Sequence, residues 1–217
     1  MKGISQKISG LIKGPEPVLF MISGGSSLSV LDHVDIGSLG SHLTISVIDE
    51  RFSTDPKVNN FCQLEQTKFF DRCIKKDVEI TGTRIHKGES LPKAVMDFKK
   101  NIYKWKKERG GKVVALLGIG KDGHTAGVMP YPENEKLFKD LFLDEEWVVS
   151  YDAKEKNEFP LRFTVTLTFL KKEVDHGIVF AKGKKEALKL LNDKNKKIHE
   201  VPAKILKEMR DIHMFTE

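Results

Sequence analysis

A short segment of the chain combines an acid, an imidazole and several glycines. Asp122 and His124 lie two residues apart, with Gly118, Gly120 and Gly123 around them. An imidazole exchanges protons near neutral pH, and a nearby carboxylate can orient the ring and stabilise its cation. The segment therefore predicts acid–base chemistry in a loop whose glycines let a ligand approach the main chain closely. The alternative is an ordinary turn, in which Asp122 caps the next segment and His124 is a surface histidine.

The residues that precede this loop predict a buried strand. Residues 113–117 are apolar without alternation, as in strands that are covered on both faces of a parallel sheet. Parallel sheets bind ligands outside the carboxyl ends of their strands. The loop that carries Asp122 and His124 is therefore expected at the ligand-binding edge of such a sheet.

A second glycine turn follows another apolar run. Residues 17–22 favour a buried strand, residues 23–27 read Ser-Gly-Gly-Ser-Ser, and an apolar-periodic segment follows. Exposed amide groups in such a turn, together with the positive end of the next helix, form a cradle for an anion. The alternative is a plain strand-to-helix turn with Ser26 or Ser27 as the helix N-cap.

Two further strands deliver polar side chains to their ends. Residues 43–48 are a β-branched run that leads into an Asp-Glu-Arg triplet at residues 49–51. The triplet is either a surface ion pair or a carboxylate and a guanidinium placed where strands converge. Asn60 opens the next helical segment, where its plain role is an N-cap. Residues 161–168 alternate in polarity as a strand does. The plain role of Arg162 within them is a surface charge at the end of this strand.

The remaining pattern alternates strands with helices. Residues 91–105 carry apolar side chains at helical spacing and predict an amphipathic helix that Gly110 ends. Residues 84–86 are read as a short edge strand. Cys62 and Cys73 fall in what reads as one helix, about 16 Å apart and too far for a disulfide, which favours a reducing cytosol. Further strands are expected at residues 147–149, 177–181 and 212–215, and further helices at residues 2–13, after Gly183 and from Val201.

The composition indicates one α/β domain over residues 1–217. The chain has no linker-like stretch, no signal-peptide pattern and no apolar run of membrane-spanning length. Its net charge of +6 comes from lysines spread along helical segments, without the basic patch or helix-turn-helix pattern of nucleic-acid-binding proteins. No His/Cys cluster has metal-ligand spacing, and no acid follows the Ser-Gly-Gly-Ser turn where a nucleotide ribose needs one. We therefore expect no nucleic acid, membrane, metal or cofactor.

The glycine-rich segment resembles a family signature. Gly-Ile-Gly-x-Asp-Gly-His-Thr-Ala followed by Pro130 is similar to the signature of the 6-phosphogluconolactonases and their relatives, the glucosamine-6-phosphate deaminases. The resemblance runs from about Val18 to the C-terminus through the Ser-Gly-Gly-Ser turn, the Asp-Glu-Arg triplet and a Pro-x-Arg-x-Thr-Leu-Thr segment. There are departures: the loop before Asn60 is slightly shorter, and the spacing after Gly183 is compressed.

This resemblance implies a modified Rossmann-like fold, with a mostly parallel sheet and helices on both faces. It also implies hydrolysis of 6-phospho-D-glucono-1,5-lactone to 6-phosphogluconate in the pentose phosphate pathway. His124 would be the general base that activates water, with Asp122 or Asp49 orienting its ring. Backbone N–H groups of the glycine loop, or Arg51, would face the oxyanion. The implied substrate- or phosphate-binding residues are Ser23, Gly24, Gly25, Ser26, Arg51, Asn60, Gly120, Arg162 and, because of the compressed spacing, both Lys184 and Lys185.

Two other functions agree less well with these residues. In the glucosamine-6-phosphate deaminases the motif continues to a glutamate where this chain has Met129, and a thioether cannot transfer protons. A non-catalytic sugar-phosphate-binding domain, as in some transcription regulators, would carry an added DNA-binding module and would not need the Asp-His pair. The sequence therefore predicts a cytoplasmic lactonase that acts on a phosphorylated sugar lactone as a monomer or weak homodimer.

Overall fold

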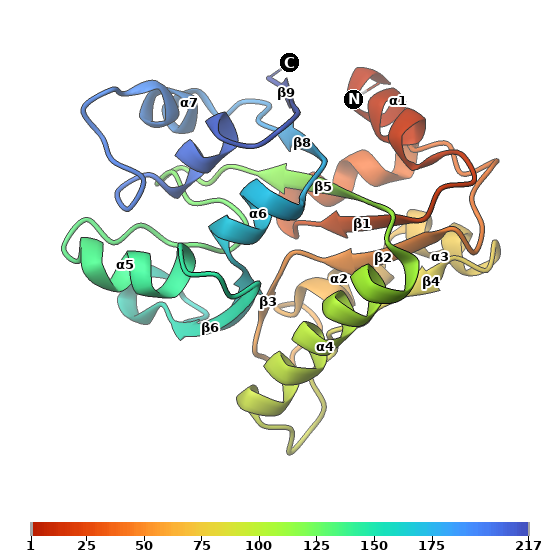
Figure 1. Ribbon diagram of the computed structural model, residues 1–217, viewed down its shortest axis with the longest axis horizontal. Coiled ribbons are helices and arrows are strands. Elements are labelled where there is room, and N and C mark those ends of the chain that lie inside the picture. Colours follow the sequence, from red (N-terminus) through yellow and green to blue (C-terminus); the bar gives the residue numbers. More distant parts are fainter. Residues whose placement is uncertain (1, 217) are drawn as a thin grey trace.

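A computed structural model describes residues 2–216, which are organised around a six-stranded sheet (Figure 1). The strands run in the order β4-β2-β1-β5-β8-β9, and every adjacent pair is parallel. The predicted α/β fold with a mostly parallel sheet is therefore confirmed. The strands of this sheet are β1 (Val18–Ile22), β2 (Leu43–Val47), β4 (Glu79–Ile80), β5 (Lys112–Gly118), β8 (His176–Phe180) and β9 (Ile212–Phe215).

The central strands are apolar throughout because alternate side chains enter two separate cores. In β1, Phe20 and Ile22 pack into one core, and Leu19 and Met21 pack into the other. The side chains of β5 are divided in the same way. Both strands are thus covered along their length, and their carboxyl ends open into polar loops.

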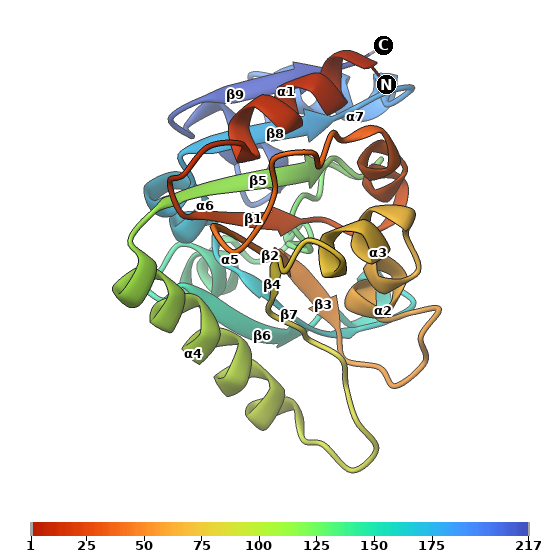
Figure 2. The ribbon, with the colours of Figure 1, turned by 90° about the vertical axis from the view of Figure 1, so that its right-hand side faces the viewer.

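Helices cover both faces of the sheet: in Figure 2, α1 and α3 lie in front of the sheet, and the fainter α5 and α6 lie behind it. In α4, the buried Trp105 donates its indole N–H to Thr44, and the left-handed Gly110 ends the helix as predicted. The first face carries α1 (Lys2–Ile12), η1 (Gly25–His33), α2 (Asn60–Glu65) and α3 (Lys68–Ile74). The second carries α4 (Leu91–Arg109), α5 (Glu135–Phe142), α6 (Leu167–Glu173), α7 (Lys185–Asn192) and the 3-10 turn η3 (Pro202–Lys207).

The structure adds a second, antiparallel sheet that the sequence pattern does not indicate. It contains β3 (Asp49–Arg51), β7 (Leu161–Val165) and β6 (Val148–Asp152) in the order β3-β7-β6. Ile48 joins the two sheets. Its N–H donates to the carbonyl of Ile22 at 3.1 Å, and its own carbonyl accepts from the N–H of Val165 at 3.2 Å. The run of residues 43–48 therefore conceals a change of sheet, because its apolar character continues across the switch.

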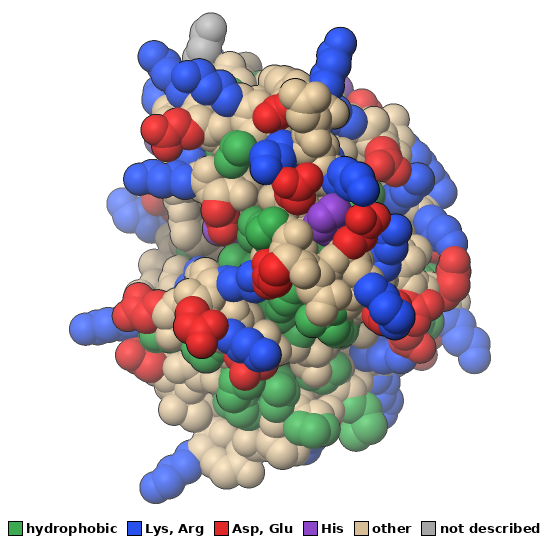
Figure 3. All heavy atoms as spheres, turned by 90° about the vertical axis from the view of Figure 1, so that its left-hand side faces the viewer, with side chains coloured by type: hydrophobic (Ala, Val, Ile, Leu, Met, Phe, Trp, Pro, Cys, Tyr) green, Lys and Arg blue, Asp and Glu red, His purple; other side chains and the backbone are tan. Residues whose placement is uncertain are grey.

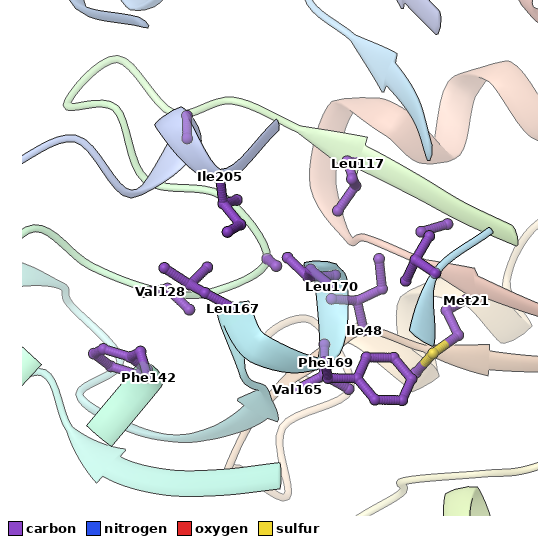
Figure 4. Packing of buried hydrophobic residues seen from close by; sticks show 14 of the residues in the cluster. Met21, Ile48, Leu117, Val128, Phe142, Val165, Leu167, Phe169, Leu170 and Ile205 are labelled. Atoms are coloured by element: carbon purple, nitrogen blue, oxygen red, sulfur yellow. The ribbon is translucent and has the colours of Figure 1, made fainter. Parts of the chain in front are cut away.

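The two sheets share one hydrophobic core (Figure 4). Leu117 of β5, Val165 of β7 and the connecting Ile48 belong to it, together with side chains of α6. Val128, which follows the glycine-rich segment, packs into the same core with no exposed surface. The glycine-rich loop is thus anchored in the core at its carboxyl-terminal end.

The helix expected around the two cysteines is interrupted. α2 and α3 are separate because the side chain of Thr67 caps α3 and accepts from the N–H of Phe70 at 3.2 Å. Cys62 and Cys73 therefore lie in different helices, and both are buried free thiols. Burial raises the pKa of the Cys73 thiol to about 12, so this side chain is protonated at neutral pH.

Two strand predictions also need correction. Residues 84–86 form no strand in the structure, and the edge of the main sheet is instead β4, which pairs with β2. β7 ends at Val165 because Thr166 caps α6 and accepts from the N–H of Phe169 at 3.1 Å. Residues 161–168 are therefore divided between a strand and a helix, which alternation of polarity alone does not indicate.

Candidate active site

Most of the residues predicted to form a site line one pocket of about 280 Å³ at the carboxyl ends of β1 and β5. Two of the predicted residues do not line it: Asp122 lies behind His124, and Lys185 begins α7. A larger groove of about 450 Å³ lies along α4 and contains none of the predicted residues. The predicted residues in the pocket are Ser23, Gly24, Gly25, Ser26, Asp49, Arg51, Asn60, Gly120, His124, Arg162 and Lys184.

Asp122 is the acid in contact with the ring of His124. Its Oδ1 lies 2.6 Å from His124 Nδ1 and also accepts from the His124 backbone N–H at 3.1 Å. Burial raises the pKa of Asp122, but the hydrogen bond and charge of His124 outweigh burial and hold that pKa below its ordinary value. Asp122 is therefore an ionised acceptor at neutral pH. In the neutral imidazole, Nδ1 therefore carries the proton and Nε2 has the available lone pair.

The ring of His124 lies against Gly120, which explains why a glycine is needed there. A Cβ on residue 120 would fall 2.1 Å from the ring and 2.7 Å from Asp122 Oδ1. The Gly120 N–H donates to the His124 carbonyl at 2.8 Å, so this amide is already used inside the loop. Gly120 therefore gives the ring room and does not offer its amide to a ligand.

The small sheet holds the glycine-rich loop from behind. Thr164 of β7 donates its hydroxyl to the carbonyl of Ala126 at 2.5 Å. Tyr151 of β6 donates to the carbonyl of Gly127 and accepts from the N–H of Met129 at 3.3 Å. Burial raises the pKa of Tyr151, so the phenol stays protonated and remains a donor. These bonds fix the loop on the sheet that also supplies the arginines of the pocket.

Another wall of the pocket is a buried polar cluster. Arg162 is 2% exposed, and its Nη2 lies 3.4 Å from Asp49 Oδ2. Asn60 donates from Nδ2 to the Asp49 carbonyl at 2.9 Å and to Asp49 Oδ2 at 3.3 Å. Strand pairing places Arg51 opposite Arg162. Asp49 thus contacts Arg162 and Asn60, whereas Asp122 contacts His124.

Capping and pocket lining are done by different residues at the start of α2. Asn59 is the N-cap, and its side chain accepts from the N–H of Cys62 at 2.9 Å. The side chain of Asn60 instead faces the glycine turn, so closely that a Cβ on Gly24 would lie 2.1 Å from Asn60 Oδ1. Asn60 therefore connects the end of β3 with the turn that follows β1.

The Ser-Gly-Gly-Ser-Ser turn leads into the 3-10 helix η1. Neither Ser26 nor Ser27 is its N-cap, because Gly24 takes that position and the Ser27 hydroxyl donates back to the Ser23 carbonyl at 2.7 Å. The first amides of a helix lack acceptors within the helix. Gly25 and Ser26 line the pocket, and the anion cradle that the sequence predicts at their amides stays a prediction.

Buried polar atoms without hydrogen-bond partners gather at this pocket. Within residues 2–216 they include Ser23 Oγ, Asn60 Oδ1, and Nε and Nη1 of Arg162. Leaving such atoms unpaired is costly, so the pocket is shaped to receive a polar ligand. Among its described lining residues, one acid, Asp49, faces four cationic side chains, which favours an anion. These cations are Arg51, Lys121, Arg162 and Lys184.

Some residues of the site have no role in the sequence predictions. Lys121 lines the pocket, and its place inside the glycine-rich segment is the signal that could have identified it. Thr164 and Tyr151 position the loop, but their partners are set by tertiary pairing and leave no local pattern.

Met129 is 1% exposed, belongs to the hydrophobic core and is separate from the pocket lining.

One face of the protein carries mixed charge. Figure 3 shows basic and acidic side chains interleaved on one face, and ion pairs such as Lys136–Asp140 lie along α5. Within residues 2–216, no cluster of three or more His, Cys, Asp or Glu side chains is suited to hold a metal ion. In the same part of the chain, no helix is long and apolar enough to cross a membrane.

Comparison with known proteins shows which family this arrangement comes from. The model of the family described as glucosamine-6-phosphate isomerases/6-phosphogluconolactonase matches residues 1–214. The protein belongs to this family. The resemblance seen in the glycine-rich segment is therefore confirmed and extends over nearly the whole chain. No curated protein matches the sequence.

Solved structures from both branches of the glucosamine-6-phosphate isomerase/6-phosphogluconolactonase family share the fold. A 6-phosphogluconolactonase from Shewanella baltica is 16% identical with a TM-score of 0.75, over 99% of this chain and 93% of its own. A 6-phosphogluconolactonase from Plasmodium vivax is 20% identical with a TM-score of 0.74, over 99% and 86%. A monomeric glucosamine-6-phosphate deaminase is 16% identical with a TM-score of 0.62, over 98% and 90%. These likenesses confirm the fold. Because both lactonases and a deaminase share it, the residues of the site have to distinguish lactone hydrolysis from deamination.

Proposed function

We propose that the protein hydrolyses 6-phospho-D-glucono-1,5-lactone to 6-phosphogluconate. The observation that carries this proposal is that His124, in contact with Asp122, lines the same pocket as the buried Arg162, two of whose nitrogens lack hydrogen-bond partners within residues 2–216. A proton acceptor and an anion-binding group are the two requirements for hydrolysing a phosphorylated lactone. Membership of the family, and the lactonases among the structures that share the fold, support this choice.

In this proposal, His124 is the general base. Asp122 accepts from Nδ1 and leaves Nε2 to take a proton from water as the water oxygen bonds to the lactone carbonyl carbon. Asp122 stabilises the imidazolium that results. When the tetrahedral intermediate collapses, the bond between the carbonyl carbon and the ring oxygen breaks, and the imidazolium returns its proton to that oxygen. The product acid then releases a proton to solvent, which gives the reaction a convenient signal.

The cationic side chains that line the pocket would bind the phosphate and the developing oxyanion. Arg162 has two unpartnered nitrogens, and Lys184 lines the pocket from the loop after β8. Of the two candidate lysines, Lys184 is therefore the one assigned to the phosphate. The Gly120 amide is engaged within its loop, so Arg51, whose Nε lacks a partner within residues 2–216, is the candidate for the oxyanion.

Deamination of glucosamine 6-phosphate is the alternative with the same fold, and the position of Met129 speaks against it. Its side chain packs in the core, and its backbone N–H donates to Tyr151. That placement puts no acid where the deaminase motif has its glutamate. A sugar-phosphate sensor without catalysis would have no use for the Asp122–His124 pair.

The test is a direct assay on the purified protein. Freshly generated 6-phosphogluconolactone is added, and acid release is followed against the spontaneous background. The same preparation is incubated with glucosamine 6-phosphate, and ammonia release is measured. Lactone hydrolysis above background without ammonia release is the expected result. Ammonia release that disappears on His124→Ala would contradict the assignment, even if some lactone were also hydrolysed.

A further inference from the structure

Glu50 is a buried carboxylate that the proposed mechanism leaves without a task. It is 0% exposed, and four neutral donors converge on it. Its Oε1 accepts from the N–H groups of Arg51 at 2.8 Å and Asn60 at 2.5 Å. Its Oε2 accepts from the N–H of Phe61 at 2.9 Å and from the hydroxyl of Thr83 at 2.7 Å. A buried carboxylate is costly unless its acceptor sites are filled, as they are here.

The backbone N–H groups that donate to Glu50 belong to the elements that build one wall of the pocket. This wall is the buried cluster of Arg162, Asp49 and Asn60, and we call it the anion-binding wall. Arg51 lies in β3, and Asn60 and Phe61 are the first two residues of α2. The carboxylate therefore fixes the start of α2 on β3. From that point the Asn60 side chain donates to Asp49 and lies against Gly24. A shift of α2 would move the amide group that holds Asp49 in place.

Thr83 reaches the same carboxylate from outside the pocket. It is 7% exposed and lines the separate groove along α4. Its hydroxyl can therefore be removed without changing any residue that lines the candidate site. This makes Thr83 the position at which the role of Glu50 can be tested from a distance.

The general base is held by different contacts. Asp122 orients His124, and Thr164 and Tyr151 fix the loop behind them. Within residues 2–216, every hydrogen bond to the Glu50 carboxylate comes from β3, α2 or the segment at Thr83. The consequence of disturbing it should therefore fall on anion binding and leave proton transfer nearly unchanged.

We propose that Glu50 is a positioning residue, which holds α2 on β3 so that Asn60 and Asp49 keep the anion-binding wall in shape. Thr83 completes the set of donors. The proposal rests on the proposed function, in which the bound anion is the phosphate of a sugar lactone. It makes no use of Glu50 as an acid or base toward the substrate.

The primary experiment compares Thr83→Val with Thr44→Val. Both changes remove a buried threonine hydroxyl with nearly constant volume. The hydroxyl of Thr44 in β2 donates to Glu79 of β4 at 2.9 Å and accepts from the indole N–H of Trp105, and it lies away from the pocket. We expect Thr83→Val to raise KM by about 3- to 10-fold and to leave kcat within about twofold, because a buried hydrogen bond is lost behind the anion site. Thr44→Val should leave both constants unchanged.

Two substitutions of Glu50 itself supply the rescue arm. Glu50→Gln can keep its carbonyl oxygen toward Arg51 and Asn60 and donate its amide group to the hydroxyl of Thr83, but the Phe61 N–H loses its acceptor, so we expect KM to rise by less than about tenfold. Glu50→Met fills the space and offers no oxygen, and we expect KM to rise by about 10- to 100-fold. Loss of activity in Glu50→Gln with unchanged KM would assign the carboxylate a direct chemical role and overturn the proposal.

A binding arm separates this inference from the assignment of the reaction. Affinity for inorganic phosphate and for 6-phosphogluconate is measured by calorimetry on the wild type and on both threonine variants. Weaker binding in Thr83→Val than in Thr44→Val supports the positioning role even if the wild type fails to hydrolyse the lactone. Equal affinities, or a fall in kcat without a rise in KM, would overturn it even if the wild type is an efficient lactonase.

Discussion

The carboxylate of Asp49 lies 3.4 Å from the guanidinium of Arg162 where β3 and β7 pair, and the two side chains are only 7% and 2% exposed. Asp122 is in a different setting, because it contacts the ring of His124 in the loop after β5 and is 46% exposed. The sequence leaves open which acid orients the imidazole. The structure assigns one acid to the imidazole and the other to the cation.

Neutralising each acid should therefore affect a different kinetic constant. We expect Asp122→Asn to lower kcat by about 10²-fold, because the ring loses the charge that fixes its tautomer and stabilises its cation. Asp49→Asn should mainly raise KM, since it disturbs Arg162 and Asn60. Steady-state kinetics on both variants measure the difference. The same pattern in both would show that the division between the two acids is wrong.

His124→Ala should lower kcat by about 10²- to 10⁴-fold with little change in stability, because it removes a base whose side chain is 34% exposed. His86→Ala is the matched control, since His86 is exposed and lines the groove along α4 and not the candidate site. Turnover and thermal unfolding are measured for both. Near-normal turnover of His124→Ala would exclude this histidine as the base.

Arg162→Ala should change both binding and stability. Its anion-binding nitrogens are lost, so KM should rise, and Asp49 would be left buried without its cation, at a cost of about 3 kcal/mol. Arg84→Ala is the control, because its ion pair with Glu65 lies at the surface and should contribute well under 1 kcal/mol. Denaturant unfolding and KM are measured together. An unchanged KM would make Arg162 a purely structural charge.

Glu50 should make stability fall as pH rises through the weakly acidic range. Burial raises the pKa of Glu50 from 4.5 to about 7, even though four hydrogen bonds oppose the shift. The folded protein therefore keeps this proton up to about pH 7, and above that pH the ionised carboxylate accepts the four hydrogen bonds seen in the structure, whereas the unfolded chain releases the proton near pH 4.5. The free energy of unfolding should lose on the order of 3 kcal/mol from this group between those pH values.

The comparison of wild type with Glu50→Gln isolates that contribution, because glutamine does not titrate. Denaturant unfolding of both proteins at pH 5 and pH 8 should show the variant gaining stability relative to wild type as pH rises. Glu155→Gln, in the exposed turn η2 (Lys154–Lys156), should show no such trend. A pH-independent difference between wild type and Glu50→Gln would contradict the raised pKa.

Met129→Leu should keep most lactonase activity, since the swap nearly conserves volume and the side chain packs in the core away from the pocket. The stability change should stay below about 1.5 kcal/mol. Kinetics and thermal unfolding check both points. A large loss of kcat with the fold intact would mean that residue 129 takes part in the chemistry.

Local motifs predicted the parts of the site that are local in sequence. Asp122 and His124 contact each other across two residues, and the turn after β1 is one continuous segment, so residue types and spacing were sufficient. The apolar runs also predicted β1 and β5, because a strand buried on both faces needs an unbroken apolar pattern.

Contacts between distant segments could not be predicted in this way. The pairing of Asp49 with Arg162 depends on the second sheet, and the change of sheet at Ile48 leaves no mark in an apolar run. The task of Glu50 depends on Asn60, Phe61 and Thr83, which come together only when α2 docks on β3. Residue types at strand ends thus indicate an active site, while tertiary pairing decides which polar group serves which purpose.

The connection made by Ile48 also bears on when the site is completed during synthesis. β1, β2 and β5 are all available once residue 118 has been made, but Arg162 is 113 residues from Asp49. Closing so long a loop costs entropy before its contacts form, so β3 and β7 should pair late. A nascent chain can therefore assemble most of the parallel sheet while its anion-binding wall still lacks Arg162. Ligand present in the cell would stabilise only the finished molecule, which favours completed chains over truncated ones.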